Sequence, residues 1–337
     1  MRARKVGYNS RMTIEIVVVG ARGHTGSELL PLLHRHPAAR LVAVGSSSAA
    51  GEPLSSLVPG LEGCHLRFAD IRPENLQQYP ADLYVLALPN GQAAAYVAAI
   101  EENHAAAVVI DLSADYRFDA SWVYGQPERF ADRITGAKRI SNPGCYATGA
   151  QLALAPVLDW LLATPVVFGV SGYSGAGKTP SRRNDPAVLR DNLLPYSLAG
   201  HIHEREITRH LDYEVRLLPH VVSFFRGISL TMAAELNHSV DAARLLELYR
   251  EFYAAHSLIS VCENIPEVAD VRGKHGVIIG GFTVSGSGAQ HASWVCVLDN
   301  LLKGAATQVV QNMNLAFALP ALTGLETGQG SLEGEAL

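Results

Sequence analysis

The sequence predicts an α/β protein with two domains, and three observations support this prediction. The chain has 337 residues, whereas a single domain usually has about 100–200. Its first part repeats a strand–helix–strand pattern that starts at Ile14–Val19. Its later part, from about Val166, consists mainly of strand-like segments. Alternating strands and helices predict a parallel sheet covered on both faces, and the strand-rich part predicts an α+β domain.

The first strand–helix–strand unit surrounds a glycine-rich loop. Ile14–Val19 is apolar and β-branched, Glu28–His34 has helical character, and Leu41–Val44 is a second apolar run. These lengths fit a βαβ unit of about 30 residues. We therefore expect residues 13–145 to form a Rossmann-type domain that binds a dinucleotide. The pattern recurs as a strand, a helix and a strand at Leu83–Leu88, Gln92–Glu102 and Ala107–Leu112.

A second domain is expected over residues 146–302. One strong helix, Val240–His256, interrupts a series of strands, and a final helix at about Gly304–Phe317 can return to the first domain. We therefore expect a largely antiparallel or mixed sheet, with residues 303–325 completing the first domain. The predicted strands are Val166–Val170, Glu214–Leu218, Ile228–Leu236, Val277–Val284 and Ser293–Leu298.

Composition limits the partners and the compartment. The net charge is −5 with acidic and basic residues interspersed, so a nucleic-acid partner is not expected. No segment reaches the roughly 18 apolar residues of a membrane span. The cysteines are too far apart for a Cys-x-x-Cys pair, which predicts free thiols in a reducing, cytoplasmic compartment. These cysteines are Cys64, Cys145, Cys262 and Cys296.

Both ends of the chain are expected to lie outside the folded part. The first eleven residues are basic but lack the apolar segment of a secretory signal. They predict a ragged start, with a short organelle presequence as the alternative, and folded sequence from about Thr13. The tail Glu326–Leu337 is rich in Gly and Glu and is expected to fray.

Cys145 stands where a helix is predicted to begin. Asn142, Pro143 and Gly144 predict a turn, and the sequence from Tyr146 onward is apolar and alanine-rich. Free N–H groups and the positive end of the helix dipole favour the thiolate over the thiol. A thiolate is a nucleophile, so Cys145 is a candidate covalent catalyst. The alternative is a buried structural cysteine.

The loop after the first strand has the spacing Gly20-x-x-Gly23-x-x-Gly26. It follows a strand and opens a helix, as a pyrophosphate-binding turn does, although glycines also serve plain tight turns. The second strand ends in Ser46, Ser47 and Ser48, without the acidic residue that usually binds the ribose of NAD. This composition favours NADP, since hydroxyl groups can receive a 2′-phosphate. Solvated serines are the alternative.

A second glycine loop, Gly172–Thr179, fits the P-loop pattern Gly-x-x-x-x-Gly-Lys-Thr. A P-loop needs a helix that starts at the Lys-Thr pair. Pro180 and Pro186 flank a polar stretch here, which predicts a loop instead. A glycine-rich turn near the cofactor is therefore preferred over a nucleotide-hydrolysing P-loop.

His201 and His203 lie two residues apart, with Glu204 and Glu206 behind them. Such a pair shares a face in an extended segment but not in a helix. A metal site is possible in principle, but no convincing third or fourth ligand is present. A histidine that carries a proton beside a carboxylate is the other hypothesis, and a chance pair is the third.

Two arginines are candidates for binding an anion. Arg117 follows a predicted parallel strand, where the carboxyl ends of strands form the site. Arg226 stands at the start of a predicted strand. Either guanidinium can hold a carboxylate or phosphate through two hydrogen bonds, or either can be a structural charge.

Together these segments resemble the N-acetyl-γ-glutamyl-phosphate reductase family, in the branch found in fungi and some proteobacteria. The segment around Cys145 matches the family's active-site signature, and the resemblance covers about Ile14 to Leu325. His201-Ile-His203-Glu-Arg-Glu replaces the His-Arg-His-x-Pro-Glu of many bacterial members. The matching motifs are Ser141-Asn-Pro-Gly-Cys-Tyr-Ala-Thr-Gly149, Gly20-Ala-Arg-Gly-His-Thr-Gly-Ser-Glu-Leu29, Leu86-Ala-Leu-Pro-Asn-Gly91, Asp111-Leu-Ser-Ala-Asp-Tyr-Arg117, Lys303-Gly-Ala-Ala306 and Gln311-Asn-Met-Asn-Leu315.

The resemblance implies an NADPH-dependent reduction of N-acetyl-γ-glutamyl phosphate to N-acetyl-glutamate 5-semialdehyde and phosphate, a step of arginine biosynthesis. It implies a thioester on Cys145 and a histidine that pairs with the thiolate as a cation and supplies a proton, with His201 preferred and His203 second. Glu204 or Glu206 would orient that histidine. No metal is implied. The resemblance also implies a homodimer or homotetramer built on the sheet of the second domain, and a cytoplasmic enzyme (mitochondrial in a fungal source).

The residues expected to bind ligands follow from the same motifs. For the cofactor NADP they are Gly20, Arg22, Gly23, His24, Thr25, Gly26, Ser46, Ser47, Leu88, Pro89, Ser174, Gly175, Ala176, Gly177 and Asn312. For the small-molecule acyl phosphate they are Arg117, Asn142, Lys178, Arg226 and Glu204, with Arg183 as a weaker candidate.

Three other functions remain open at this stage. The nearest is a reductase of aspartyl or aminoadipyl phosphate, which differs in a few contacts with the substrate. A P-loop kinase or NTPase would depend on Lys178. A non-enzymatic dinucleotide-binding redox sensor would use Cys145 to report oxidation.

Overall fold

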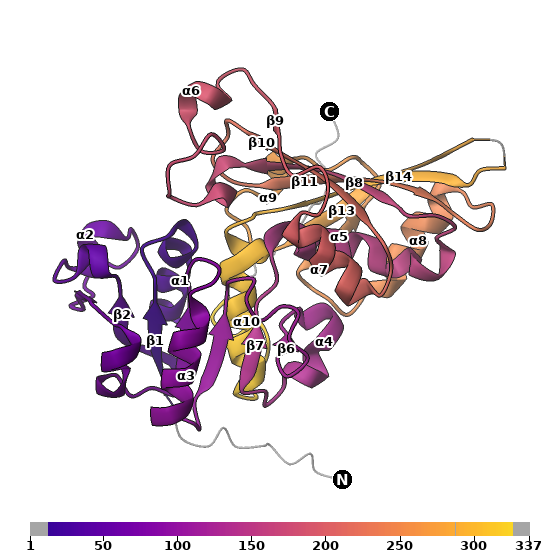
Figure 1. Cartoon of the computed structure of the whole chain (residues 1–337). Helices are drawn as coiled ribbons and strands as arrows, with labels where there is room; N and C mark the ends of the chain where they lie inside the picture. The colour runs from indigo at the N-terminus through magenta and orange to yellow at the C-terminus, as the bar shows by residue number, and fades with distance from the viewer. Residues whose placement is uncertain (1–12, 287, 326–337) are drawn as a thin grey trace, which may run out of the picture.

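The computed structural model describes residues 13–286 and 288–325, so the expected ragged start and the expected fraying of Glu326–Leu337 lie outside the described residues. Figure 1 shows two sheets, each with its own helices. Within the described residues no helix is long and apolar enough to cross a membrane.

The first sheet has seven strands in the order β3-β2-β1-β4-β5-β7-β6, and all its pairings are parallel. This confirms the Rossmann-type prediction for the N-terminal part. The short strands β3, β6 and β7 had not been predicted. The strands are β1 Ile14–Val19, β2 Ala39–Gly45, β3 Phe68–Ala69, β4 Leu83–Leu86, β5 Val108–Asp111, β6 Val123–Tyr124 and β7 Arg139–Ser141.

Successive residues of β1 explain why this sheet is covered on both faces. Ile14, Ile16 and Val18 join one apolar cluster, whereas Val17 and Val19 join another. Side chains of a strand alternate between the two faces, so an unbroken apolar run needs cover on each side. The longer helices of this domain are α1 His24–Arg35, α3 Ala93–Asn103 and α4 Pro127–Ile134.

The second sheet also has seven strands, in the order β12-β13-β14-β11-β8-β10-β9. β10 runs parallel to β8 and β12 parallel to β13, and the other pairs are antiparallel. The expected mixed sheet is thus confirmed. Its strands are β8 Val166–Gly172, β9 Leu194–Pro195, β10 Arg216–Val222, β11 Ile228–Glu235, β12 Ile259–Cys262, β13 Val277–Ser285 and β14 His291–Leu298.

Helices α5 (Cys145–Leu154), α7 (Ile202–Leu211) and α8 (Ala242–Phe252) accompany this sheet (Figure 1). Only α8 had been predicted as a strong helix of the strand-rich part, so α7 is a correction. Its buried residues include the charged Glu206, and a charged residue on the buried face interrupts the apolar pattern by which helices are recognised. The remaining short helices are α2 Leu54–Leu57, α6 Pro186–Leu189 and α9 Val268–Val271.

The C-terminal segment returns to the first sheet. Helix α10 (Thr307–Ala316) packs against α1, α4 and β5, and its Val309, Val310 and Met313 belong to the apolar cluster around β1. The chain therefore passes between the sheets twice, from β7 to α5 and from β14 to the π-helix η5 (Leu302–Ala306). A Cβ atom added to Gly304 would stand 2.8 Å from the Cβ of Cys145, so the two passages touch.

A buried ion pair supports the second passage. Lys303 Nζ lies 2.7 Å from Glu128 Oε1 and donates to Gln311 Oε1 at 2.7 Å. The side chains of Lys303 and Glu128 are 0% and 4% exposed. Each charge depends on the other, because an unpaired charge at such depth loses its hydration without compensation.

Replacing Lys303 by methionine should lower the free energy of unfolding by about 3–5 kcal/mol, since it leaves the Glu128 carboxylate buried and unpaired. Urea unfolding followed by circular dichroism measures the loss. Arg244→Ala is the matched control, because Arg244 forms its ion pair with Glu247 on the surface and surface pairs contribute little. Equal losses in the two variants would contradict this account.

Candidate active site

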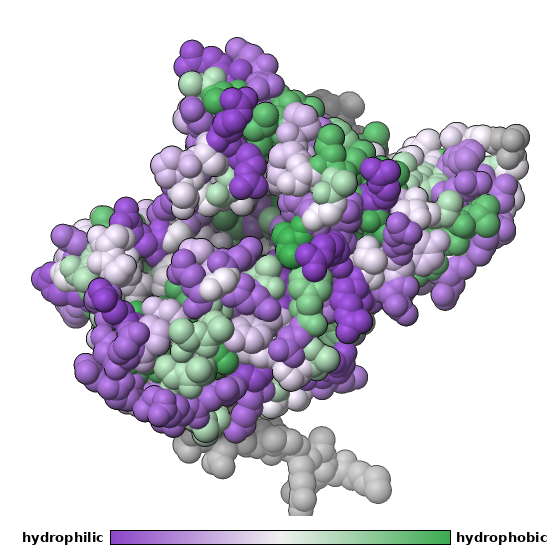
Figure 2. All heavy atoms as spheres, in the orientation of Figure 1, coloured by the Kyte–Doolittle hydropathy of each residue, from purple (hydrophilic) through white to green (hydrophobic). Residues whose placement is uncertain are grey.

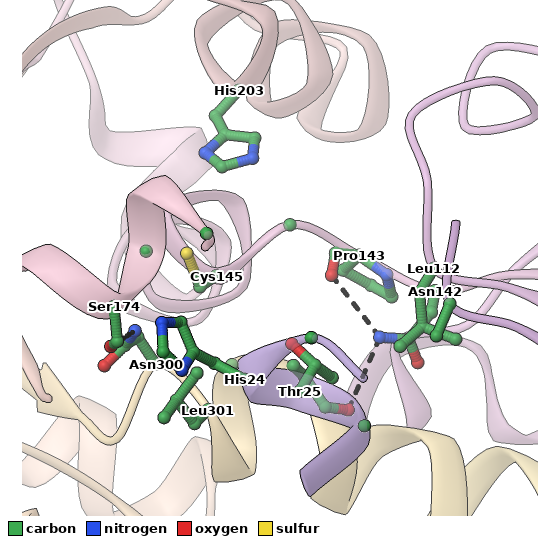
Figure 3. A pocket seen from close by; sticks show the side chains of 18 of the residues that line it. His24, Thr25, Leu112, Asn142, Pro143, Cys145, Ser174, His203, Asn300 and Leu301 are labelled. Atoms are coloured by element: carbon green, nitrogen blue, oxygen red, sulfur yellow. Dashed lines mark hydrogen bonds between the residues drawn. The ribbon is translucent and has the colours of Figure 1, made fainter. Parts of the chain in front are cut away.

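The two passages between the sheets enclose a cavity of about 270 Å³. Figure 2 shows the surface hollowed between the two domains, and Figure 3 shows side chains of the cavity wall. The wall draws on the carboxyl ends of β1, β4, β5 and β7, on α5 and α7, and on the passage after β14. Ligands of parallel sheets usually bind at these strand ends. The lining residues with polar side chains are His24, Thr25, Arg117, Asn142, Cys145, Ser174, His203 and Asn300.

Cys145 is the first residue of α5 and faces this cavity, as its sequence context predicts. Two glycines make room for it. A Cβ atom on Gly144 would stand 2.2 Å from Nε2 of His203 and 2.7 Å from Nη1 of Arg117. A Cβ atom on Gly304 would press on Cys145 itself. The turn before α5 therefore lies against a histidine, an arginine and the second passage.

The carboxylate of Glu206 fixes the turn in place. Its Oε1 accepts the backbone N–H of Gly144 at 2.9 Å and the hydroxyl of Tyr124 at 2.7 Å, and its Oε2 accepts Nη1 of Arg117 at 2.9 Å. Glu206 is wholly buried. A carboxylate at that depth needs such partners to offset its lost hydration. Glu206 thus orients the turn before Cys145, and its bonds go to none of the histidines.

Arg117 and Asn142 line the cavity and also brace it. Arg117 donates from Nε to the carbonyl of Asn142 at 3.0 Å and from Nη2 to that of Leu112 at 2.9 Å. With the bond to Glu206, three of its five N–H groups are used. Asn142 accepts the side-chain amide of Asn312 at 3.0 Å. Asn312 is wholly buried and therefore positions this turn, where the sequence had suggested a cofactor contact.

The surroundings of Cys145 favour the thiol. Burial raises the pKa of Cys145 to about 11, although the backbone N–H of Tyr146 and the charge of Arg117 lower it in part. The sequence had suggested the opposite direction from the start of a helix alone. The prediction was wrong in direction, because the loss of water around the sulfur atom outweighs the effect of the helix terminus.

His203 faces the same cavity as Cys145 (Figure 3). Burial lowers the pKa of His203 well below its usual value, and the charge of Arg117 lowers it further. The ring is therefore neutral at pH 7. Its Nδ1 is buried and has no hydrogen-bond partner among the described residues.

His201 stands outside the cavity wall, at the start of α7. Its Nδ1 accepts the backbone N–H of His203 at 3.1 Å, so it caps the helix. Its ring meets those of Tyr146, Tyr196 and His203 edge-on. The two histidines thus mark a helix start and not an extended segment. The structure places His203 on the cavity wall that Cys145 also lines, whereas the sequence had preferred His201.

Glu204 does not orient a histidine. Its Oε1 accepts the N–H of Gly200 and its Oε2 accepts the N–H of Leu217, both at 2.9 Å. The carboxylate is therefore engaged by backbone groups of its own domain. Its hydrogen bonds therefore go to neither histidine, and only its charge reaches His201, whose pKa it raises in part against the larger effect of burial.

Arg226 and Lys178 also lie away from the cavity wall. Arg226 pairs with Asp299 through Nε at 2.7 Å and with Glu28 through Nη2 at 3.0 Å. Two carboxylates already neutralise it, so the expected contact with substrate is not supported. Lys178 donates to the carbonyl of Arg22 at 2.7 Å and lines a separate cavity.

Most of the residues predicted to bind the cofactor gather at the cavity. Gly23, His24, Thr25, Gly26, Leu88, Ser174, Gly175 and Gly177 line it. Gly20 lies beneath the loop, with φ +77° and no room for a Cβ atom beside the carbonyl of Ala87 at 2.5 Å. Ser46, Ser47, Pro89 and Ala176 are not on this wall. The chain after Lys178 runs as a loop to α6, so the P-loop alternative is wrong.

The sequence of this chain is similar to those of known reductases over both domains. Residues 15–137 match the family model described as semialdehyde dehydrogenase, NAD binding domain, and residues 145–300 match semialdehyde dehydrogenase, dimerisation domain. The chain is 47% identical to the N-acetyl-gamma-glutamyl-phosphate reductase of Xanthomonas campestris pv. campestris (strain B100), over 93% of this chain and 100% of that protein. It belongs to the N-acetyl-γ-glutamyl-phosphate reductase family. The reductase of Stenotrophomonas maltophilia (strain R551-3) is 46% identical, over 93% and 98% of the two chains.

Solved structures show that this family shares its fold with aspartate semialdehyde dehydrogenases. Aspartate semialdehyde dehydrogenase II from Vibrio cholerae, complexed with ASA, has a TM-score of 0.75 at 19% identity and covers 91% of this chain and 98% of that one. The enzyme from Candida albicans with NADP has a TM-score of 0.71 at 17% identity, covering 91% and 99%. At such identities the likeness concerns the fold.

The sequence missed one part of the reductase site, the passage after β14. Asn300, Leu301, Gly304 and Ala305 line the cavity. Asn300 accepts the N–H of Gly227 at 2.6 Å and donates to Oγ of Ser174 at 2.8 Å, so it holds the second glycine loop. The polar pair at residues 299–300, directly after an apolar strand, is the signal by which this passage could have been found.

The assembled groups suit acyl transfer. A thiol, a neutral imidazole and an arginine share one cavity beside a dinucleotide-type glycine loop. Among residues 13–286 and 288–325, no group of three His, Cys, Asp or Glu side chains could hold a metal ion.

The raised pKa of Cys145 predicts that the unliganded protein carries a thiol at neutral pH. Thiolate absorbance near 240 nm, taken as the difference between wild type and Cys145→Ser, should appear only as the pH rises well above the value of about 8.5 for free cysteine. The subtraction removes the contributions of Cys64, Cys262 and Cys296. A midpoint below that of free cysteine would show that the helix start dominates after all.

Proposed function

We propose that this protein reduces N-acetyl-γ-glutamyl phosphate to N-acetyl-glutamate 5-semialdehyde and phosphate with NADPH, as part of arginine biosynthesis. The shared cavity of Cys145, His203 and the glycine loop at Gly23–Gly26 is the observation that carries the proposal. The names of the full-length relatives support it.

Cys145 and His203 begin the reaction as a neutral pair. The sulfur attacks the acyl carbon while the imidazole of His203 takes the thiol proton. This differs from the cationic partner that the sequence suggested. The backbone N–H groups at the start of α5 are placed to stabilise the negative oxygen of the tetrahedral intermediate.

The second half of the reaction returns the protein to its starting state. The C–O bond to phosphate breaks, His203 passes its proton to the departing phosphate oxygen, and a thioester remains on Cys145. NADPH, when bound, supplies the hydride that reduces a thioester to the aldehyde level. The sulfur then leaves as thiolate and takes a proton from water, so each turnover consumes one proton.

The cradle at the first glycine loop fits a dinucleotide. No atom lies within 4 Å of a Cβ added at Gly23, so the loop is open toward the cavity. A Cβ added at Gly26 would stand 2.0 Å from the carbonyl oxygen of Ala21, so only glycine lets α1 start this close to the loop. The end of β2 carries Ser46 and Ser47 with no carboxylate. That composition favours NADP over NAD.

The substrate's charged groups need cationic partners. Arg117 keeps two N–H groups free at the cavity and is assigned to the phosphate, beside Asn142. Arg183 is assigned to the carboxylate at the other end of the substrate. It lies over the ring of Tyr196, and that ring in turn contacts the ring of His201.

The proposal also covers the roles of the two domains, the oligomeric state and the location of the protein. Residues 13–145 with 303–325 would bind the cofactor, and residues 146–302 would carry catalysis and self-association. The matched dimerisation model and the 37% exposure of Phe168 on β8 support a homodimer or homotetramer. A cytoplasmic location is supported by the bacterial relatives and by four free thiols.

The reverse reaction tests the function. With N-acetyl-glutamate 5-semialdehyde, phosphate and NADP, wild type should produce NADPH absorbance at 340 nm, and Cys145→Ser should produce none because it cannot form the thioester. Aspartate semialdehyde is the competing substrate. A higher kcat/KM for aspartate semialdehyde would reject the assigned substrate, and an inactive wild type would reject the reductase.

The histidine assignment has its own test. His203→Asn should lower kcat by about 10²–10⁴-fold, as expected for a lost general acid–base group. His201→Asn is the matched control and should retain most of the activity, since asparagine can still cap α7. Thermal unfolding shows whether both variants are folded. A larger loss in His201→Asn would reverse the assignment.

A further inference from the structure

A second cavity, of about 200 Å³, lies beside the first glycine loop. It has a basic side and an apolar side, and the two domains both contribute to it. Its lining residues are Arg22, Ser27, Leu57, Val58, Phe68 and Lys178. The cavity is separate from the wall that holds Cys145.

The basic side of this cavity is formed by the positive charges of Lys178 and Arg22. Lys178 reaches from the second glycine loop, and its Nζ donates to the backbone carbonyl of Arg22 at 2.7 Å. The guanidinium of Arg22 donates to Oγ of Ser48 at 2.6 Å, at the end of β2. Two like charges this close repel each other unless an anion joins them. Burial lowers the pKa of Lys178, and the charge of Arg22 lowers it further.

At the carboxyl end of β2, a Rossmann-type domain binds the 2′ position of the adenosine ribose of its dinucleotide. Here that end offers the hydroxyls of Ser46 and Ser48, which lie 3.5 Å apart, and the guanidinium of Arg22. All of these groups can donate hydrogen bonds, and none repels an anion. Guanidinium and ammonium groups bind phosphate through charge-assisted hydrogen bonds.

We propose that Lys178 and Arg22 together bind the 2′-phosphate of the cofactor, so that a lysine of the second domain determines the preference for NADP. This rests on the proposed function and replaces the expected contact of Lys178 with substrate. The apolar side supports it, since Leu57 is a large apolar side chain left 47% exposed beside the two cations. A nucleoside that carries a phosphate presents the same combination of apolar and anionic surfaces.

Calorimetric binding of 2′,5′-ADP and 5′-AMP tests this without any turnover. Both probes share adenosine and the 5′-phosphate, and only the first has the 2′-phosphate. Wild type should bind 2′,5′-ADP at least about tenfold more tightly, the usual size of a charge-assisted contact. Lys178→Gln should lower the affinity for 2′,5′-ADP by about tenfold and change the affinity for 5′-AMP by less than about twofold.

Two further variants sharpen the result. Lys178→Arg should keep the preference, because the charge remains. Lys138→Gln is the control, an exposed lysine before β7, which lies beside the edge strand β6 at the opposite end of the first sheet, and it should match wild type. If Lys178→Gln binds both probes as wild type does, the assignment of Lys178 is overturned while NADP preference stands. If wild type itself shows no preference, the NADPH proposal fails with it, whereas reductase activity is judged separately by the reverse reaction.

Discussion

The buried carboxylate of Glu206 holds together the parts on which the site depends. It lies on α7 in the second domain, yet its three partners come from the loop after β5, from β6 and from the turn before α5. Arg117 extends the network to the carbonyls of Leu112 and Asn142. A carboxylate is stable at this depth only when such groups compensate its lost hydration. The position of Cys145 therefore depends on a buried charge that is not itself part of the cavity wall.

The same dense surroundings set the protonation of the reacting groups. Burial raises the pKa of Cys145 and lowers that of His203, so both groups are uncharged at rest. In the proposed reaction, charge would then develop only while a bond to the acyl carbon forms, and the proton would pass between two groups that line the same cavity. An uncharged thiol is also a poorer target for oxidants than a thiolate, since reactivity follows the thiolate form.

The sequence predicted the parts of this protein that are governed by local patterns. The apolar run at Ile14–Val19, the glycine spacing after it and the turn before Cys145 all depend on near neighbours. It could not predict which arginine reaches the cavity, because the partners that hold Arg226 away from it lie far away in sequence at Glu28 and Asp299. Nor could it separate His201 from His203. That distinction depends on a helix whose buried face contains a glutamate.

The double passage between the sheets has a consequence for recombining this protein with its relatives. Gly304 lies against Cys145, so the chain enters and leaves the second domain at one place. A chimaera with a single border near residue 145 takes everything after that border, including α5, η5 and α10, from one parent. Its C-terminal helix would then pack against a first domain from the other parent. Contacts such as the ion pair of Lys303 with Glu128 would then join residues from two different parent proteins. Two borders, one before Cys145 and one after Asn300, exchange the second domain as a unit and leave both the nucleotide-side core and its C-terminal helix intact.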